Sequence, residues 1–277
     1  MPVFVGILAI LALALNLLPP GLLDLPGFQW AQRWSGADPR IVRWVNTEVK
    51  AVALTFDDGP DPVYTPDLLE LLSARKVKAT FFLIGKMVDA RPDLARLLVL
   101  QGHELGNHSY NHPPMAHLSR EEVDFQLQEA SKIIEKATGM RPRYFRPPLN
   151  SHNDQLVSAV VSGGMTFIHW SVDSRDWESN SVDGIAGRVL THAQPGDIIL
   201  FHDHGGDRSV TIKAVEKVID GLSARGYVFV TIGELLKIGR PASVAGPEER
   251  RLWRTRSSRE QRERSTDREV WSPGGRD

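Results

Sequence analysis

Residues 52–60 read VALTFDDGP, an apolar run that ends abruptly in two aspartates, a glycine and a proline. Such a run is typical of a buried strand, and the Gly-Pro pair after it predicts a sharp turn. Asp57 and Asp58 therefore stand side by side at the carboxyl end of the expected strand. Adjacent carboxylates repel, so in a closed site both stay ionised only beside a cation or an arginine. Taken alone, the sequence Asp-Asp-Gly-Pro is equally typical of an ordinary turn.

Similar strand patterns recur from about residue 50 to 238, and helical patterns separate them. The expected strands cover 52–56, 80–84, 103–106, 143–146, 166–172, 197–202 and 227–231. The expected helices cover 66–75, 92–101, 120–137, 154–163, 182–192 and 210–225. Roughly seven βα units predict a parallel sheet, which is either open and doubly wound or closed into a barrel.

Polar side chains follow the expected strands at their carboxyl ends. Beyond the two aspartates, this set comprises His108, His112, Arg146, Asp173, Asp176, Trp177 and His202. Loops at the carboxyl ends of parallel strands converge on one crevice, whereas buried structural polar residues have no reason to share that end. The sequence therefore predicts a single functional crevice built from several strands.

The motif HSYNH at 108–112 places two imidazoles four residues apart, so one helical turn on a loop would bring both to the same side. Isolated pairs of this spacing mostly bind no metal. With the carboxylate of Asp58, however, His108 and His112 form a set that leaves coordination positions open, as catalytic metal sites do. Zinc is the default metal for this set, and Co²⁺, Ni²⁺, Mn²⁺ and Fe²⁺ also suit it.

Two further groups have both a structural and a catalytic interpretation. Arg146 precedes two prolines and is either part of a surface turn or a guanidinium that grips a carboxylate such as Asp57. His202 ends an apolar strand and is either a buried structural histidine or a general acid. The second interpretation requires Asp176 to reach the imidazole and raise its pKa; otherwise Asp176 simply caps the next helix.

Composition limits the classes of function. The 277 residues are 42% hydrophobic and 24% charged, which is typical of a globular protein. Lys and Arg number 33 and Asp and Glu number 34, so a net charge of −1 argues against a nucleic-acid partner. The chain has no cysteine, which excludes disulfides, thiolate metal sites and cysteine nucleophiles.

The two ends fall outside the alternating pattern. Residues 1–20 contain an apolar run closed by Pro-Pro, which predicts a membrane anchor or a signal peptide and an extracytoplasmic protein. No Lys or Arg precedes this run, so the positive-inside rule does not favour export. Residues 21–49 are expected to lead into a domain at 50–240, and residues 241–277, with alternating charges, to form a solvated tail.

The ordered motifs resemble those of the polysaccharide deacetylase family, the carbohydrate esterases that share a NodB-type homology domain. They are TFDDGP at 55–60, HSYNH at 108–112, RPP at 146–148, DSRDW at 173–177 and LFH at 200–202. The resemblance covers about residues 50–238. It implies an α/β fold with one catalytic domain, a distorted (β/α)7 barrel that holds a divalent metal, usually zinc.

The resemblance also implies a role for each motif residue. Asp57 would be the general base and His202 the general acid. Arg146 would orient the base, and Asp176 would assist the acid. The implied metal ligands are Asp58, His108 and His112.

Three further residues would shape the substrate pocket. Trp177 and Leu200 would wall the space for the acetyl methyl group, and the backbone N–H of Leu149 would supply the oxyanion donor. The family commonly has an aromatic residue and a glycine where this chain has Leu149 and Asn150, which affects the expected substrate preference. The resemblance assigns no role to His204.

The implied activity is metal-assisted removal of N-acetyl groups from a sugar polymer with release of acetate. The expected partner is an acetylated glycan such as peptidoglycan, a chitin-like oligomer or an exopolysaccharide; oligomeric state is not predicted. An esterase that removes O-acetyl groups would use the same residues. A non-catalytic sugar-binding member of the fold is the other alternative, and the presence of Asp57 and His202 argues against it.

Overall fold

The computed structural model describes residues 38–242, so the expected membrane segment at 1–20 and the tail from 243 onward lie outside the described residues. Within that range, no helix is both long enough and apolar enough to cross a membrane. The main sheet has nine strands in the order β1-β7-β6-β5-β4-β3-β9-β8, with β10 also paired to β3. A separate pair, β2 (Trp44–Asn46) and β11 (Arg240–Ala242), is antiparallel.

The main-sheet strands are β1 (Ile41–Val42), β3 (Ala51–Asp57), β4 (Thr80–Leu83), β5 (Glu104–Asn107), β6 (Tyr144–Phe145), β7 (Thr166–Ile168), β8 (Val172–Asp173), β9 (Ile198–His202) and β10 (Val228–Phe229). The α-helices are α3 (Tyr64–Ala74), α4 (Gly85–Ala90), α5 (Pro92–Leu100), α6 (Arg120–Thr138), α7 (Asp154–Ser162), α8 (Val182–His192), α9 (Ser209–Ala224) and α10 (Ile232–Leu235). Two short 3₁₀ turns, η2 (Met115–His117) and η3 (Pro148–Asn150), lie in loops.

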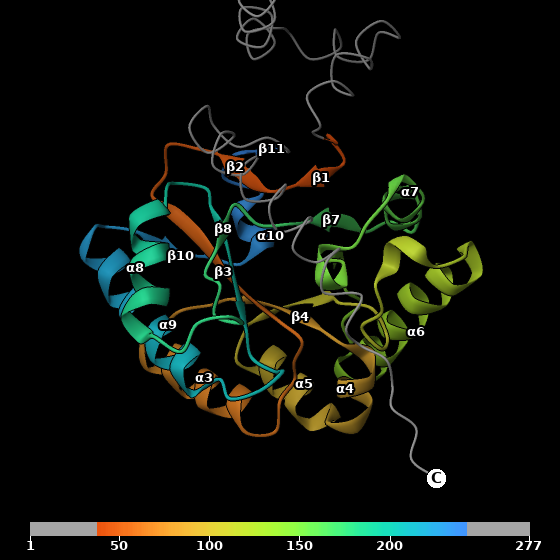
Figure 1. The fold of residues 1–277 in the computed structure, drawn as a ribbon, viewed down its shortest axis with the longest axis horizontal. Helices are drawn as coiled ribbons and strands as arrows, with labels where there is room; N and C mark the ends of the chain where they lie inside the picture. Colours follow the sequence, from red (N-terminus) through yellow and green to blue (C-terminus); the bar gives the residue numbers. More distant parts are fainter. Residues whose placement is uncertain (1–37, 243–277) are drawn as a thin grey trace, which may run out of the picture. The chain divides into compact units, whose positions relative to one another are not determined.

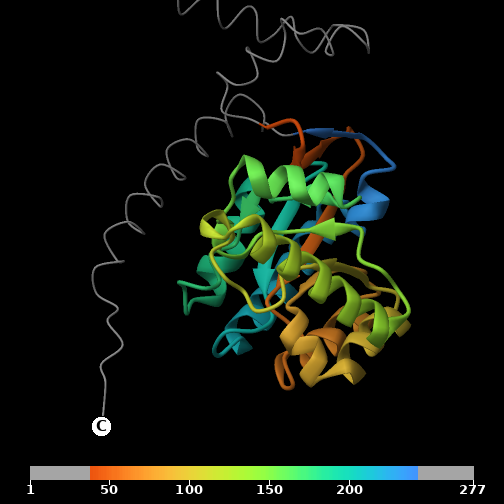
Figure 2. The ribbon, with the colours of Figure 1, turned by 90° about the vertical axis from the view of Figure 1, so that its right-hand side faces the viewer.

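All ladders of the main sheet are parallel, and the sheet curls with helices around it (Figures 1 and 2). Its edge strands β1 and β8 form no ladder with each other in the described part of the chain, so the barrel is incompletely closed. The predicted distorted α/β barrel is confirmed.

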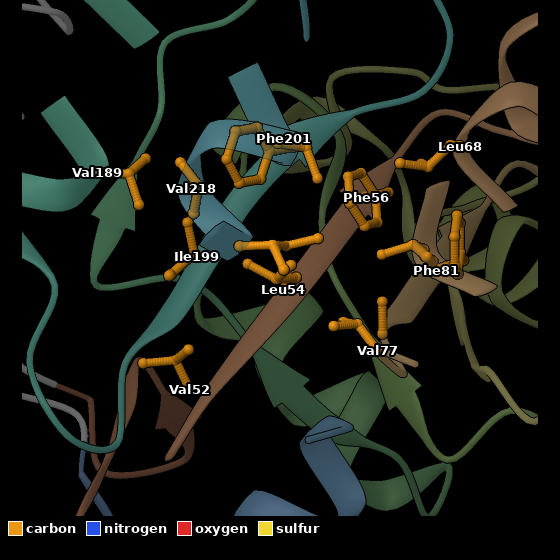
Figure 3. Packing of buried hydrophobic residues seen from close by; sticks show 14 of the residues in the cluster. Val52, Leu54, Phe56, Leu68, Val77, Phe81, Val189, Ile199, Phe201 and Val218 are labelled. Atoms are coloured by element: carbon orange, nitrogen blue, oxygen red, sulfur yellow. The ribbon is translucent and has the colours of Figure 1, made fainter. Parts of the chain in front are cut away.

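Strand β3 is buried along its whole length. Val52, Leu54 and Phe56 alternate along it and join the cluster that packs the sheet against its helices (Figure 3). The ring of Phe56 stacks on Phe81 at 5.1 Å and on Phe201 at 5.8 Å between centroids. Because side chains alternate between faces, this outward apolar row directs the intervening residues of β3 to the barrel interior, including Asp57 at its carboxyl end.

The strand expected at 166–172 is divided into β7 and β8, which corrects the sequence prediction. His169 N donates to the carbonyl of Val42 at 2.7 Å, and Ser171 N donates to the carbonyl of Ile198 at 3.0 Å. The segment thus leaves the β1 side of the sheet and joins β9 within three residues. An unbroken strand would stay paired with the same neighbouring strand along its whole length. Because the barrel is not closed between β1 and β8, this segment changes its neighbour and the strand is interrupted.

Several short elements were not expected from the sequence. Strands β1 and β2 lie within the region expected to lead into the domain, and β11 lies at its far boundary. Helices α4 and α10 span 6 and 4 residues. Each of these elements is shorter than the stretch over which hydrophobic periodicity identifies a strand or a helix.

The first testable prediction concerns Gly106, which pairs with Phe82 across β5 and β4. A Cβ built at Gly106 would meet Phe82 Cδ1 at 2.4 Å, so Gly106→Ala should displace that ring and lower the free energy of unfolding by about 1–3 kcal/mol. Gly187→Ala, inside α8, is the control, because a Cβ there meets nothing within 4 Å. The control should raise stability by about 0.5–1 kcal/mol in chemical denaturation. Equal effects of both changes would contradict this packing.

Candidate active site

The residues singled out in the sequence gather at the carboxyl ends of the strands, as predicted. Asp57 ends β3 and His202 ends β9, whereas His108 and Arg146 directly follow β5 and β6. Asp176 lies in the loop after β8. These elements are parallel neighbours in one curled sheet, so their loops bring the side chains into a single site.

Arg146 and Asp57 form a buried ion pair. Arg146 Nη1 donates to Asp57 Oδ1 at 2.7 Å and to Thr55 Oγ1 at 2.8 Å, and Nη2 donates to the carbonyl of His169 at 3.0 Å. The side chain of Arg146 is 0% exposed and that of Asp57 is 4% exposed. The guanidinium also lies 4.1 Å from the ring centroid of Phe82. Asp57 Oδ1 is thus held in place, while Oδ2 lies 3.9 Å from His108 Nε2.

Asp58, His108 and His112 converge beside this pair. Asp58 Oδ1 lies 3.3 Å from His108 Nε2 and 3.1 Å from His112 Nε2, and the three atoms lie within 4.8 Å of one another. Asp58 Oδ1 is buried and accepts no hydrogen bond from the described residues. His108 Nδ1 lies 2.8 Å from the carbonyl of Arg146, which fixes the proton on Nδ1 and leaves the Nε2 lone pair for a ligand. Three lone pairs aimed at one space suit a divalent cation.

The loop that carries the two histidines is not the helical turn expected from their spacing. Ser109 and His112 have φ of 69° and 62°, in the left-handed region. Ser109 N donates to Asn107 Oδ1 at 2.8 Å, and His112 N donates to Ser109 Oγ at 3.0 Å. Side-chain oxygens therefore accept the N–H groups that a helical turn would direct to backbone carbonyls, which explains the different conformation.

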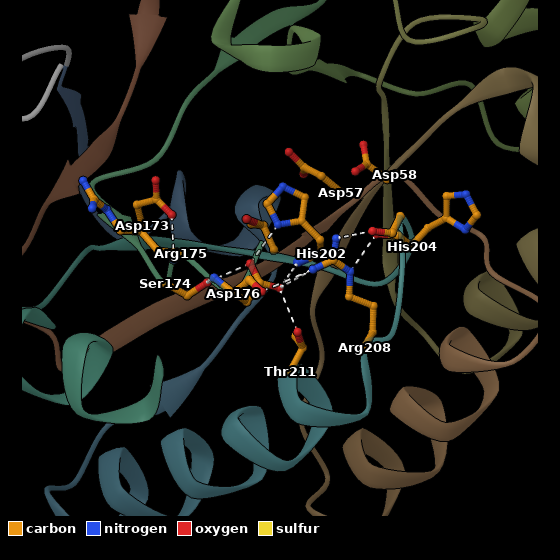
Figure 4. Close-up of polar contacts among 12 residues, drawn as sticks. Asp57, Asp58, Asp173, Ser174, Arg175, Asp176, His202, His204, Arg208 and Thr211 are labelled. Carbon is orange, nitrogen blue, oxygen red and sulfur yellow. Dashed lines mark hydrogen bonds and ion pairs between the residues drawn. The ribbon is translucent and has the colours of Figure 1, made fainter. Parts of the chain in front are cut away.

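His202 and Asp176 form the second charged pair of the site (Figure 4). His202 Nδ1 lies 2.8 Å from Asp176 Oδ1, and His202 N donates to Asp176 Oδ2 at 2.9 Å. Thr211 and Ser174 also donate to Asp176, at 3.1 Å each, so its buried carboxylate makes four hydrogen bonds with three residues. Burial alone would lower the pKa of His202, but the carboxylate of Asp176, together with smaller contributions from Asp58 and Asp57, raises that pKa to about 9. The imidazole is therefore protonated at neutral pH and has Nε2–H left to donate.

Two of the three predicted pocket residues, Leu149 and Trp177, expose apolar surface. Leu149 and Trp177 are 52% and 43% exposed, whereas Leu200 is buried on the same face of β9 as His202. Leu149 and Asn150 have φ of 55° and 54°, so both adopt the left-handed conformation although neither is glycine.

A second polar cluster, which sequence analysis did not predict, lies beside the site. Asp203 is buried against Gly59 and accepts a hydrogen bond from Thr65. Burial raises the pKa of Asp203 to about 7. His204 Nδ1 lies 2.6 Å from Asp61 Oδ2, which gives this histidine a structural partner. These contacts join residues more than a hundred positions apart, so no local pattern reveals them.

The second testable prediction concerns the pKa of His202. Asp176→Asn removes the charge that favours the imidazolium while burial still disfavours it, so the pKa of His202 should fall by about 1–3 units. NMR titration of the metal-free protein measures this shift, with the His202 signal assigned from a His202→Gln variant. The control is Asp183→Asn, because Asp183 is exposed on α8 and its ion-pair partner within residues 38–242 is Lys217. An unchanged His202 pKa in Asp176→Asn would contradict the electrostatic account.

Comparison with known proteins identifies relatives of this chain. Residues 45–168 match the family model described as polysaccharide deacetylase. A peptidoglycan-N-acetylglucosamine deacetylase of Bacillus cereus is 41% identical over 199 residues, which cover 71% of this chain and 93% of the relative. A chitooligosaccharide deacetylase of Sinorhizobium fredii is 38% identical over 200 residues, which cover 68% of this chain and 93% of the relative.

Solved structures give the same result. A peptidoglycan N-acetylglucosamine deacetylase superposes with a TM-score of 0.70 at 32% identity, covering 78% of this chain and 98% of the other. A CE4 family pseudoenzyme from Bacillus anthracis superposes with a TM-score of 0.67 at 37% identity, covering 72% of this chain and 69% of the other. Overall similarity therefore does not separate active from inactive members of the family. Whether a member is active depends on its site residues.

Proposed function

Because this chain belongs to the polysaccharide deacetylase family, we propose that it hydrolyses N-acetyl groups on an N-acetylglucosamine polymer and releases acetate. The observation that carries the proposal is the arrangement of the site. Asp58, His108 and His112 offer converging ligand atoms beside the Arg146–Asp57 pair, and protonated His202 completes the set. The names of the relatives support peptidoglycan or chitin-type oligomers as the substrate class.

The three converging residues fit a divalent cation, and we propose zinc as its default identity. When bound, such a cation polarises an amide carbonyl and acidifies a water molecule. The contribution of the chain is to hold the ligand atoms: the carbonyl of Arg146 orients His108, and the turn after β3 presents Asp58. The same set also suits the other divalent metals named above.

The remaining steps follow from the positions of the proton-transfer groups. Asp57 accepts a proton from the attacking water through Oδ2, because Arg146 already occupies Oδ1. The backbone N–H of Leu149 donates to the oxyanion that forms on the acetyl carbonyl. His202 then donates its Nε2 proton to the departing sugar nitrogen as the C–N bond breaks. An amine leaving group needs such a proton, and protonated His202 can supply it.

The third testable prediction separates the base from the ligands. Asp57→Asn keeps the side-chain size but removes both the proton acceptor and the charge that faces Arg146. In protein shown to be folded by thermal unfolding, acetate release from a chitin oligomer should fall about 10²–10⁴-fold while metal stays bound. His112→Ala removes one of three protein ligands, so metal content should fall with activity, and excess metal should restore part of it. Metal analysis beside turnover measures both effects. If Asp57→Asn loses metal as His112→Ala does, Asp57 is a ligand and the base lies elsewhere.

We also propose that residues 1–20 hold the protein at a membrane with the barrel outside the cytoplasm. The support is the apolar run at 3–18 with its Pro-Pro-Gly end. The fourth testable prediction is that the full chain sediments with membranes and resists a salt wash, whereas a chain that starts at Trp34 stays soluble and equally active. Solubility of both chains, or loss of folding in the shorter one, would contradict this assignment.

A further inference from the structure

The loop between the two histidine ligands has an unusual hydrogen-bond arrangement. Its N–H groups from Ser109 to His112 are all accepted by side-chain oxygens. Asn107 and Ser109, which belong to the same short segment, accept two of these groups. The acceptor for the other two lies outside the segment, on α6.

That acceptor is Gln126, which is 6% exposed. Gln126 Oε1 accepts from Tyr110 N at 2.9 Å and from Asn111 N at 3.1 Å. Gln126 Nε2 donates to Asn111 Oδ1 at 2.6 Å. One buried carboxamide therefore makes three hydrogen bonds to two successive residues, both between His108 and His112.

The carbonyl groups of the loop are held from the opposite side. Gly85 N donates to the carbonyl of Ser109 at 3.0 Å, and Lys86 N donates to that of Tyr110 at 2.8 Å. Both donors open α4, which packs tightly on α6, since a Cβ at Gly85 would meet Ala130 Cα at 2.8 Å. The loop is thus fastened between α4 through its carbonyls and α6 through Gln126.

The two histidines depend on this loop to different degrees. His108 is buried directly after β5 and is oriented by the carbonyl of Arg146. His112 is 28% exposed in its side chain, has a left-handed backbone and follows Asn111 directly. The position of its Nε2 atom therefore rests mainly on the path of the loop backbone.

We propose that Gln126 is a positioning residue for the metal site, which holds the loop in the conformation that brings His112 to Asp58. The inference rests on the proposed function only in using the same three ligands. The test of this inference measures metal affinity, so its result does not depend on whether the protein hydrolyses a glycan.

The test measures the zinc dissociation constant of the metal-stripped full chain by chelator competition. Gln126→Leu removes all three hydrogen bonds and should weaken zinc binding about 10–100-fold, the range typical of lost outer-shell support. Gln126→Glu keeps the acceptor for Tyr110 N and Asn111 N but loses the donor to Asn111 Oδ1, so its zinc affinity should fall between those of the parent and Gln126→Leu. The matched control is Gln128→Leu, because Gln128 is exposed on the same helix and should leave zinc affinity unchanged.

Two further measurements distinguish positioning from general stability. Thermal unfolding of the metal-free variants reports folding directly, and if Gln126→Leu fails to fold, Gln126→Ala leaves room for water and should show the same loss of affinity. Excess zinc should restore acetate release in Gln126→Leu, because the proton-transfer groups are intact. Parent-like zinc affinity in folded Gln126→Leu or Gln126→Ala, or an equal loss in Gln128→Leu, overturns the inference. Failure of the parent chain to bind zinc would instead overturn the proposed metal site.

Discussion

Arg146 is completely buried, and its positive charge is stabilised in the barrel interior by Asp57, with Thr55 and the carbonyl of His169 as further acceptors. Removing one partner of such a pair leaves an uncompensated buried charge, at a cost of about 3–5 kcal/mol. The pair joins the carboxyl ends of β3 and β6, and the backbone carbonyl of Arg146 orients His108. The side chain of Arg146 therefore orients the carboxylate of Asp57, and its backbone carbonyl orients the imidazole of His108.

The second requirement of the site is that a proton acceptor and a proton donor exist at the same pH. Their surroundings differ accordingly: Asp57 faces a guanidinium, and His202 faces the carboxylate of Asp176. Asp176 keeps its charge through hydrogen bonds from His202, Thr211 and Ser174. The raised pKa of His202 supplies the proton donor, while Arg146 orients the Asp57 carboxylate that accepts a proton.

The sequence predicted the central strand and the convergence of the site because both follow from short-range patterns. Strand β3 is an uninterrupted buried run. The carboxyl ends of parallel strands lie at the same edge of a sheet regardless of the conformation of the loops. The helical turn expected at 108–112 was wrong because side chains of Asn107, Ser109 and Gln126 replaced backbone acceptors. The break at 169–171 depends on barrel closure, and the role of Gln126 depends on a contact fifteen positions away. Neither leaves a local signal.

The most direct test of the account is a zinc titration of the metal-stripped protein while acetate release is followed. We predict that N-acetylglucosamine oligomers lose acetate in proportion to bound zinc, with saturation at one zinc per chain. This prediction would be contradicted by acetate release that is independent of metal, by release from acetylated xylan alone, or by no release from any N-acetylated glycan at saturating zinc.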